Sequence, residues 1–251
     1  MFTFADGRRK VGVFVKTDSP QVVEILGLCD LDFAVLDAEH APFDRRTMDR
    51  MLFTARAIGL PMLVRIPDHH DATILSVLDM GAGGIVVPHV DSAADAGNVL
   101  AAARFVGGRR GISLSARFGG YGTRSRDAAI AEADRSLVVC QIESSAAVAA
   151  VEEIAAVPGL GGLLIGRADL ALCLGLAGPR HPDVMAAVDR IIAAARPHDL
   201  PVLVACGGDA ELGEFAALGA HGFIVGSDQS LLRDAGSKLR GVLNAVALQG
   251  V

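Results

Sequence analysis

Acidic and basic side chains stand at the ends of short apolar segments in this chain, where they could carry out chemistry. Asp37, Glu39 and His40 directly follow the apolar run at residues 33–36. Charged groups are costly inside a core, so their place at the end of such a run fits the mouth of a pocket. Histidine titrates nearest neutral pH and suits proton transfer, and Asp37 is placed to hold one ring nitrogen of His40. We therefore expect an acid–base site here.

Two further carboxylates, Glu143 and Asp169, stand at the ends of later apolar runs. Carboxylate oxygens from neighbouring strand ends, with waters and a chelating substrate, make the octahedral shell that Mg2+ or Mn2+ prefers. The alternative is that each carboxylate caps the helix that follows it. Because they come from neighbouring segments, we predict that they bind a divalent metal ion.

Arg65 is isolated among apolar neighbours and is followed by Pro67. A buried guanidinium needs an anion, and its planar fork matches a carboxylate or an enolate oxygen. The alternative is an ion pair with a carboxylate of the chain itself, such as Glu39.

Eight apolar runs bounded by Gly, Pro or acidic residues are predicted to be the strands that carry these groups. They lie at residues 11–16, 33–40, 61–67, 83–88, 137–144, 161–169, 201–207 and 222–228. Helical segments lie between most of them, such as residues 44–58, with an apolar stripe at Met48, Met51, Leu52 and Ala55. Eight strands alternating with helices over 251 residues predict a single (β/α)8 barrel domain, residues 1–251, whose strand ends converge on one mouth. A doubly wound sheet is the alternative, although no GxGxxG turn follows any strand.

Two segments depart from this regular pattern. The connection at residues 107–136 is long and rich in arginine and glycine, and residues 126–133 are expected to form a short helix within it. The last helix, residues 229–248, carries an apolar stripe that includes Leu231, Leu239 and Leu243. This stripe either closes the barrel of its own chain or packs on a neighbouring subunit.

The composition excludes several classes of partner. The formal net charge is −6, which argues against nucleic acid, since phosphate binding needs a basic surface. No apolar run reaches the roughly 18 residues that cross a membrane, and the first residues show no secretory signal. The four cysteines are widely spaced and are expected to be thiols in the cytoplasm. Walker, GxSxG and HExxH motifs are also lacking.

Taken together, these motifs resemble the HpcH/HpaI family of metal-dependent (class II) pyruvate aldolases over nearly the whole chain. The carriers are LDAEHAP around His40, VRIP around Arg65, LDMGAGGIVVPHV at residues 78–90, QIES around Glu143 and IGRADLALCLG at residues 165–175. The resemblance implies a phosphoenolpyruvate/pyruvate-type (β/α)8 barrel. It also implies a trimer or hexamer with the last helix exchanged between subunits.

The resemblance further implies a role for each matching residue. Glu143 and Asp169 would bind the metal, and His40, oriented by Asp37, would be the acid/base. Arg65 would face the oxygens of the pyruvyl group. The remaining expected contacts are Gln141 beside the substrate, Asp79 from an adjacent subunit, and the backbone N–H groups of Ala168 and Asp169 on the substrate carboxylate.

The expected reaction is that of an aldehyde-lyase. A 2-oxo acid such as pyruvate or hydroxypyruvate would add as an enolate to an aldehyde, giving a 4-hydroxy-2-oxo acid, or the reverse. The expected ion is Mg2+ or Mn2+, with Co2+, Ni2+ or Zn2+ as alternatives. A Schiff-base aldolase needs a lysine at the mouth, and of the three lysines only Lys16 ends a predicted strand.

Two other functions stay open from the sequence. One is a related metal-enolate barrel lyase that acts on an acyl-CoA thioester. The other is a non-catalytic module that binds a 2-oxo acid. One position also departs from the family pattern, because Arg167 stands where the family often has proline, which leaves the acceptor aldehyde open.

Overall fold

A closed barrel of eight parallel strands forms the centre of the computed structural model, which describes residues 2–248. The strands are β1 (Lys10–Val15), β2 (Phe33–Asp37), β3 (Met62–Arg65), β4 (Gly84–Val87), β5 (Leu137–Ile142), β6 (Gly162–Ile165), β7 (Val202–Cys206) and β8 (Gly222–Ser227). Each strand pairs with the next, and β8 pairs with β1 to close the ring. The predicted (β/α)8 barrel is therefore confirmed, and the doubly wound alternative is wrong.

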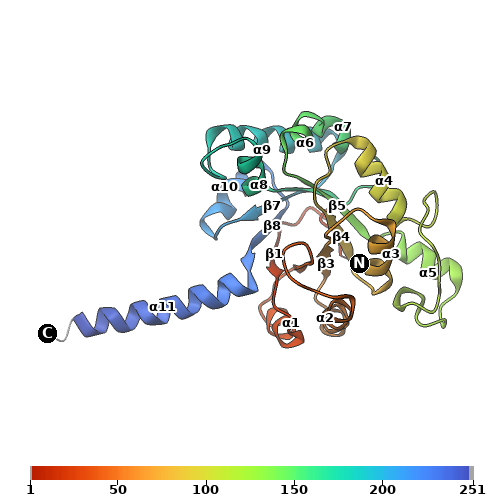
Figure 1. Ribbon diagram of the computed structural model, residues 1–251, viewed down its shortest axis with the longest axis horizontal. Coiled ribbons are helices and arrows are strands. Elements are labelled where there is room, and N and C mark those ends of the chain that lie inside the picture. Colours follow the sequence, from red (N-terminus) through yellow and green to blue (C-terminus); the bar gives the residue numbers. More distant parts are fainter. Residues whose placement is uncertain (1, 249–251) are drawn as a thin grey trace.

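Helices surround the barrel as an outer layer, except the last one, which extends away from it (Figure 1). They are α1 (Pro20–Gly27), α2 (Arg45–Ile58), α3 (Asp71–Asp79), α4 (Ala93–Ala103), α5 (Arg126–Ala133), α6 (Ser145–Ala149), α7 (Val151–Ala155), α8 (Arg167–Cys173), α9 (Pro182–Ala195), α10 (Ala210–Leu218) and α11 (Asp228–Leu248). Two short 3₁₀ segments, η1 (Arg117–Gly119) and η2 (Arg196–His198), complete the set. The short helix expected at residues 126–133 is present as α5.

Helix α2 shows how the local sequence sets these elements. Its predicted apolar stripe is buried against the strands. The Asp44 side chain accepts a hydrogen bond from the Thr47 N–H at 2.7 Å and so caps the start of the helix. Gly59 ends it in the left-handed conformation, with φ of 77°, which glycine adopts without a steric penalty.

The barrel interior is filled by one cluster of side chains. Its members are Phe4, Phe33, Val35, Leu63, Val86, Val139, Leu164, Leu203 and Ile224. Phe4, which precedes β1, is fully buried and packs edge-on against Phe33, with ring centroids 5.0 Å apart. Because apolar side chains fill this interior, the open end at the carboxyl ends of the strands is left for polar groups.

All eight strands end before the predicted apolar runs do, and for β2 and β6 the difference is three residues or more. Strand β2 stops at Asp37, so Glu39 and His40 lie in the turn after it. Strand β6 stops at Ile165, and the prediction that the strand continues to residue 169 is wrong. Gly166 leaves the extended conformation there, and Arg167 begins α8. Asp169 is consequently held by the first turn of a helix.

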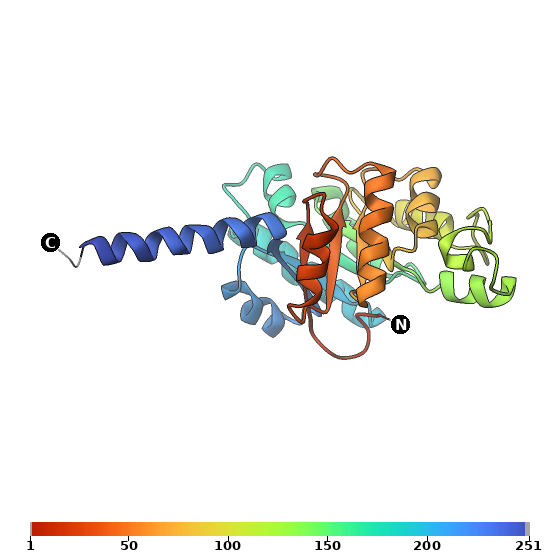
Figure 2. The ribbon, with the colours of Figure 1, turned by 90° about the horizontal axis from the view of Figure 1, so that it is seen from below.

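The last helix leaves the barrel as a long arm, which Figures 1 and 2 show from two directions. It does not cover the barrel of its own chain, so the alternative in which its apolar stripe closes that barrel is wrong. Leu232 and Leu239 on this arm are 78% and 74% exposed. Within residues 2–248, no helix combines the length and the apolar character needed to cross a membrane.

Candidate active site

The inward-facing side chains change from apolar to polar toward the carboxyl ends of β2, β3 and β5. Alternate residues of a strand face the same side, so Val35 is followed inward by Asp37, and Leu63 by Arg65. The polar members of this inner face are Asp37, Arg65, Gln141 and Glu143. The barrel closure therefore brings four of the predicted site residues together at one end, three of them on different strands.

Asp37 and Arg65 form a buried ion pair with two parallel hydrogen bonds. The Arg65 Nε donates to Oδ1 of Asp37 at 2.9 Å, and Nη2 donates to Oδ2 at 2.8 Å. Lys16 adds a second cation, with Nζ 3.1 Å from Oδ2. Burial alone would raise the pKa of the Asp37 carboxyl, but hydrogen bonds and charge from Arg65 and Lys16 outweigh it and lower the pKa.

Arg65 also contacts the second acidic residue of this region. Its Nε lies 3.2 Å from Oε2 of Glu39, and its guanidinium carbon lies 4.6 Å from the ring centroid of Phe14. The expected pairing of Arg65 with a carboxylate of the chain is therefore present, with Asp37 as the principal partner. Arg65 still lines the cavity described below, so it can also meet a bound anion.

His40 lies at the rim of the site with an exposed imidazole. Its Nε2 is 3.7 Å from Oε2 of Glu39. Asp37 accepts a hydrogen bond from the backbone N–H of His40, at 3.2 Å, in place of the expected bond to the ring. The pKa of Glu39 is raised, because burial outweighs the charges of Arg65 and His40, and the negative charge of Glu143 raises it further.

Glu143 is a buried carboxylate whose partners are neutral or titratable groups. Its Oε1 accepts the backbone N–H of His89 at 2.8 Å and lies 3.1 Å from Nδ1 of the same residue. Gln141 donates from Nε2 to Oε2 of Glu143, and its own Oε1 is buried with no hydrogen-bond partner. Within the described residues, no lysine or arginine forms an ion pair with Glu143.

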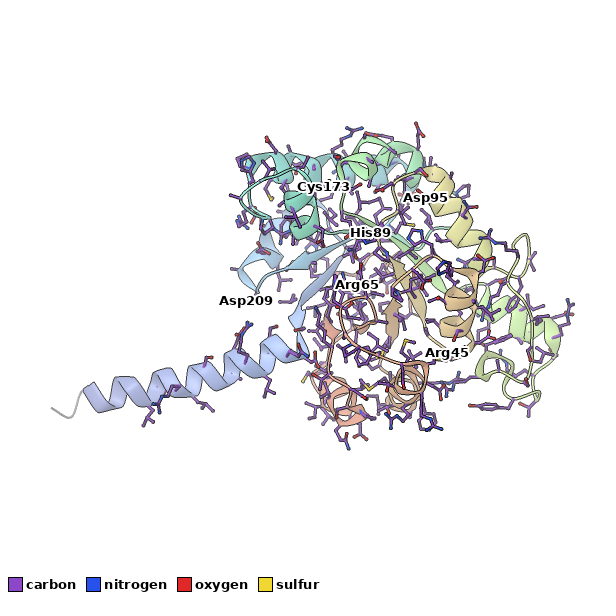
Figure 3. The ribbon with its side chains drawn as sticks, in the orientation of Figure 1. Arg45, Arg65, His89, Asp95, Cys173 and Asp209 are labelled. Carbon is purple, nitrogen blue, oxygen red and sulfur yellow. The ribbon has the colours of Figure 1, made fainter. Side chains whose placement is uncertain are left out.

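His89 bridges two of the acidic groups. Its Nε2 lies 3.5 Å from Oε1 of Glu39, while its Nδ1 faces Glu143. The residue has a φ of 52°, an uncommon conformation for a side chain other than glycine. Figure 3 labels His89 and Arg65 within the ring of strands.

Gly166, directly before α8, lies against the Glu143 side chain. A Cβ atom added at Gly166 would come within 2.8 Å of Glu143 Cβ and 3.0 Å of its Oε2, so only glycine allows this close approach. Asp169 follows three residues later, with an exposed side chain. The start of α8 is thus packed directly on Glu143.

A cavity of about 290 Å³ adjoins the site and is lined by His40, Arg65, Gln141, Ala168 and Asp169 among the predicted site residues. Its lining residues are Phe14, His40, Arg65, Gln141, Leu164, Gly166, Arg167, Ala168, Asp169, Pro179, Ala205, Cys206 and Gly207. Burial, and secondarily the charge of Glu211, raises the pKa of the Cys206 thiol to about 11, so this cysteine is protonated at neutral pH.

The donor set fits a divalent cation with oxygen ligands. Glu143 and Glu39 are acidic groups whose charges repel each other; burial is the main cause of the raised pKa of Glu39, and the charge of Glu143 adds to it. A cation beside Glu143 would relieve this repulsion, and carboxylate oxygens suit Mg2+ or Mn2+. Across the described residues, no group of three or more His, Cys, Asp or Glu side chains is arranged to hold a metal.

Asp79 is not part of this site within one chain. It is the last residue of α3 and precedes β4, so it lies at the opposite end of the barrel from His40. Its Oδ1 accepts a hydrogen bond from Arg110 Nη2 at 2.7 Å. The expectation that Asp79 reaches the site of an adjacent subunit stays a prediction.

Three residues that the structure places in this site were not among the predicted site residues. Glu39 had been identified only as a neighbour of His40 and as an alternative partner of Arg65. Lys16 had been considered only as a Schiff-base candidate, and His89 had no assigned role. Two of them could have been identified from the sequence. His89 is the histidine directly after the fourth apolar run, and Lys16 is the basic residue that ends the first apolar run.

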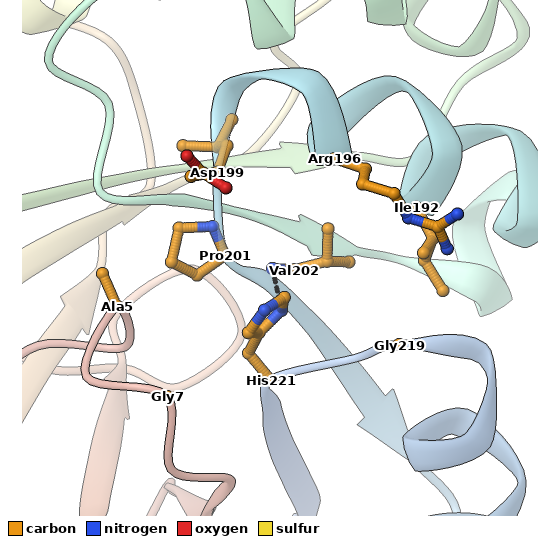
Figure 4. A pocket seen from close by; sticks show the side chains of 10 residues that line it. Ala5, Gly7, Ile192, Arg196, Asp199, Pro201, Val202, Gly219 and His221 are labelled. Carbon is orange, nitrogen blue, oxygen red and sulfur yellow. Dashed lines mark hydrogen bonds between the residues drawn. The ribbon is translucent and has the colours of Figure 1, made fainter.

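A larger cavity, of about 550 Å³, lies at the other end of the barrel (Figure 4). Its lining includes Arg196, Val202 and His221 near the starts of β7 and β8. The His221 Nδ1 accepts the Val202 N–H at 3.3 Å, and burial together with the charge of Arg9 lowers the pKa of His221. This cavity is separate from the site that contains His40 and Glu143.

Comparison with known proteins identifies relatives over most of the chain. Residues 10–235 match the family model described as HpcH/HpaI aldolase/citrate lyase. A 5-keto-4-deoxy-D-glucarate aldolase from Klebsiella pneumoniae is 35% identical over 232 residues, which cover 92% of this chain and 90% of that protein. The corresponding aldolase from Salmonella newport is 33% identical with the same coverage.

Solved structures give the same result. A HpcH/HpaI aldolase/citrate lyase family protein from Burkholderia cenocepacia superposes with a TM-score of 0.90 at 32% identity, covering 95% of this chain and 96% of that one. The citrate synthase SbnG superposes with a TM-score of 0.86 at 26% identity, covering 96% of both chains.

Proposed function

The chain belongs to the HpcH/HpaI aldolase/citrate lyase family, and on that premise we propose that it is a metal-dependent aldolase that makes or cleaves a 4-hydroxy-2-oxo acid. Pyruvate or a related 2-oxo acid such as hydroxypyruvate is the enolate donor, and an aldehyde is the acceptor. The relatives named above are 5-keto-4-deoxy-D-glucarate aldolases, so that compound is the first substrate to test.

The observation that carries this proposal is the buried Glu143 carboxylate, which has no lysine or arginine partner among the described residues. It lies against the start of α8, which carries Asp169, and shares the barrel mouth with Arg65. Glu143 and Asp169 are the proposed metal ligands. A divalent ion held by them would supply the positive charge that stabilises an enolate.

The side chains around these carboxylates have separate proposed roles. Arg65, fixed by its two hydrogen bonds to Asp37, faces the cavity and adds positive charge where the donor becomes negative. Gln141 lies beside the donor, and its unpartnered Oε1 can accept a hydrogen bond from it. The backbone N–H groups of Ala168 and Asp169 are proposed contacts for the donor carboxylate.

His40 is the proposed acid/base. Its imidazole lies at the rim of the cavity, where it can remove a proton from C3 of the donor and return one to the aldol oxygen. The contact of Asp37 with the His40 backbone fixes the turn that carries the ring. The pKa of Glu39 is raised, and this residue lies beside the His40 ring, so its carboxyl group can exchange a proton with the imidazole.

We also propose that the chain forms an oligomer and that it is located in the cytoplasm. The exposed apolar arm of α11 would pack on another copy of the chain, giving a trimer or hexamer. In such an assembly Asp79 of one subunit would approach the site of the next. The proposed unit is one barrel domain, residues 1–251, with the cytoplasm as its compartment, in keeping with four free cysteines.

Pyruvate release from 5-keto-4-deoxy-D-glucarate tests the proposal directly. Lactate dehydrogenase and NADH report the pyruvate formed. Activity should disappear with a chelator and return with Mg2+, Mn2+, Co2+, Ni2+ or Zn2+, and the rates should rank these ions. Deuterium exchange at C3 of pyruvate, followed by NMR without any aldehyde, tests the donor half alone. A protein that shows neither reaction with any of these ions would contradict the proposal.

A further inference from the structure

Arg167 is a buried arginine in the wall of the candidate active site. It begins α8, is 4% exposed, and lines the same cavity as His40 and Arg65. Arginine is rarely buried to this extent unless it is paired. Its guanidinium carbon lies 4.4 Å from the ring centroid of Phe215, so an aromatic face covers one side of it.

The pairing of Arg167 uses part of its guanidinium. Nη2 lies 2.5 Å from Oε2 of Glu211 and donates to the Ala205 carbonyl at 3.0 Å, and Nη1 lies 3.2 Å from Oε1 of Glu211. The Nε atom is buried and has no hydrogen-bond partner among the described residues. A buried donor without an acceptor is unfavourable, so an oxygen atom supplied by a ligand would stabilise this position.

Glu211 is held in place independently of Arg167. Its Oε2 accepts the backbone N–H of Gly207 at 2.9 Å, and its Oε1 lies 3.0 Å from Nη1 of Arg180. Gly207 itself lines the cavity. The Arg167–Glu211 pair is therefore part of a fixed wall formed by the start of α8 and the loop after β7.

Ala168 and Asp169, which are assigned to the donor, follow Arg167 in the first turn of α8, but the side-chain contacts of Arg167 differ from those of the other donor groups. The contacts of Arg167 lie on β7, on α10 and at Pro179, whereas Arg65 comes from β3 and Glu143 from the end of β5. Of the charged side chains that line the cavity, Arg65 and Asp169 are assigned to the donor and its metal ion. Arg167 is the remaining lysine or arginine in that lining.

We propose that Arg167 selects the acceptor, favouring aldehydes that carry a carboxylate at the end remote from the aldehyde carbon. The inference rests on the proposed aldolase function and names the acceptor class for it. An acceptor carboxylate placed against the Arg167 wall accepts a hydrogen bond from Nε–H and meets the positive charge of the guanidinium. An uncharged aldehyde of the same length gains neither contact.

The test compares two matched pairs of acceptors with pyruvate as donor. Succinic semialdehyde is paired with butanal, and glutaric semialdehyde with pentanal. The measured quantity is the ratio of kcat/KM for the charged to the uncharged member, in which any general loss of activity cancels. The wild-type protein is expected to favour the charged member of at least one pair by roughly tenfold or more.

Two variants should move this ratio in opposite directions. The double variant Arg167→Met/Glu211→Leu removes both charges together, which buried ion pairs often tolerate, and should lower the ratio on the order of 10-fold to 100-fold. Glu211→Gln keeps the guanidinium and removes its internal carboxylate, and it should raise the ratio. A matched exposed pair, Arg190→Met/Glu152→Leu, controls for loss of an ion pair elsewhere and should leave the ratio unchanged.

The outcomes separate the two proposals. A ratio that stays at the wild-type value in both site variants, or that falls in both, would overturn the role of Arg167. Circular dichroism melts show whether the double variant has folded. If it has not, Glu211→Gln alone decides, because the proposal requires the kcat/KM ratio to rise in that variant. Wild-type protein that exchanges deuterium at C3 of pyruvate but prefers uncharged acceptors would retain the aldolase function and lose only the acceptor assignment.

Discussion

The guanidinium of Arg65 holds both carboxylate oxygens of Asp37, at 2.9 and 2.8 Å, and both side chains are buried. The pair joins the ends of β2 and β3, so it fixes two neighbouring strand ends as well as the charge that faces the cavity. A substitution at Asp37 should therefore affect stability as well as activity.

Asp37→Asn should destabilise the fold by about 3–5 kcal/mol at neutral pH, because it leaves the Arg65 charge buried without its principal partner. The folded-state pKa of Asp37 lies below its ordinary value of 3.8. The stabilisation by this carboxylate is thus complete above that value and is lost as the pH falls through the folded-state pKa. The difference between wild type and variant, measured by urea unfolding, should be constant from pH 7 to about 5 and should narrow on further acidification.

Asp71→Asn is the matched control, because Asp71 also has two hydrogen bonds to an arginine, Arg109, but is exposed. It should change the unfolding midpoint much less. Equal losses for Asp37→Asn and Asp71→Asn would show that the buried pair contributes no more than a surface pair.

His40→Ala should lower the rate of C3 deuterium exchange in pyruvate by about 10²–10⁴, because the proton acceptor is lost. The ring is exposed, so the melting temperature should change little. His198→Ala, at another exposed histidine, should leave the exchange rate unaltered. An undiminished rate in His40→Ala would remove the acid/base assignment and direct attention to Glu39 or His89.

Lys16 should not form a Schiff base with pyruvate. Its Nζ lies 3.1 Å from Oδ2 of the buried Asp37 carboxylate, so the amine is held in an ion pair and is not free to attack a carbonyl carbon. Borohydride added with pyruvate should therefore leave the intact mass of the protein unchanged. A mass increase located at Lys16 by peptide mapping would replace the metal mechanism by an imine mechanism.

The arm formed by α11 should hold the subunits together. Leu232→Glu and Leu239→Glu place charges on side chains that one chain leaves exposed, so they should cost the isolated fold little. In an assembly that buries these leucines, each change should shift the mass measured by light scattering toward the monomer. Leu28→Glu, at an exposed leucine outside the arm, is the comparison. An unchanged assembly in both arm variants would show that α11 does not mediate it.

The barrel and its polar end could be predicted because their signals are local. The run from Phe33 to Leu36 is buried as predicted, and Asp37 ends the same strand. The stripe of α2 and its cap at Asp44 are also set by neighbouring residues. These features depend on periodicity over a few positions, which the sequence displays directly.

The pairings across the mouth could not be predicted, because they depend on which strand ends meet when the barrel closes. The contact of Lys16 with Asp37 joins β1 to β2, and the contacts of His89 with Glu39 and Glu143 join the loop after β4 to β2 and β5. The burial of Arg167 depends on Glu211, which is 44 residues away along the chain. Tertiary closure decides these contacts, and a run of residue types does not encode them.

The direct test of the central claim is a titration of the metal-free protein with Mn2+, followed by electron paramagnetic resonance of the free ion. The wild type should bind one ion per chain, and Glu143→Gln and Asp169→Asn should each weaken binding on the order of 100-fold or more, because each removes a charged oxygen ligand. Glu152→Gln, an exposed carboxylate paired with Arg190, should bind like the wild type. Wild-type affinity in both site variants would contradict a metal centre at Glu143 and Asp169.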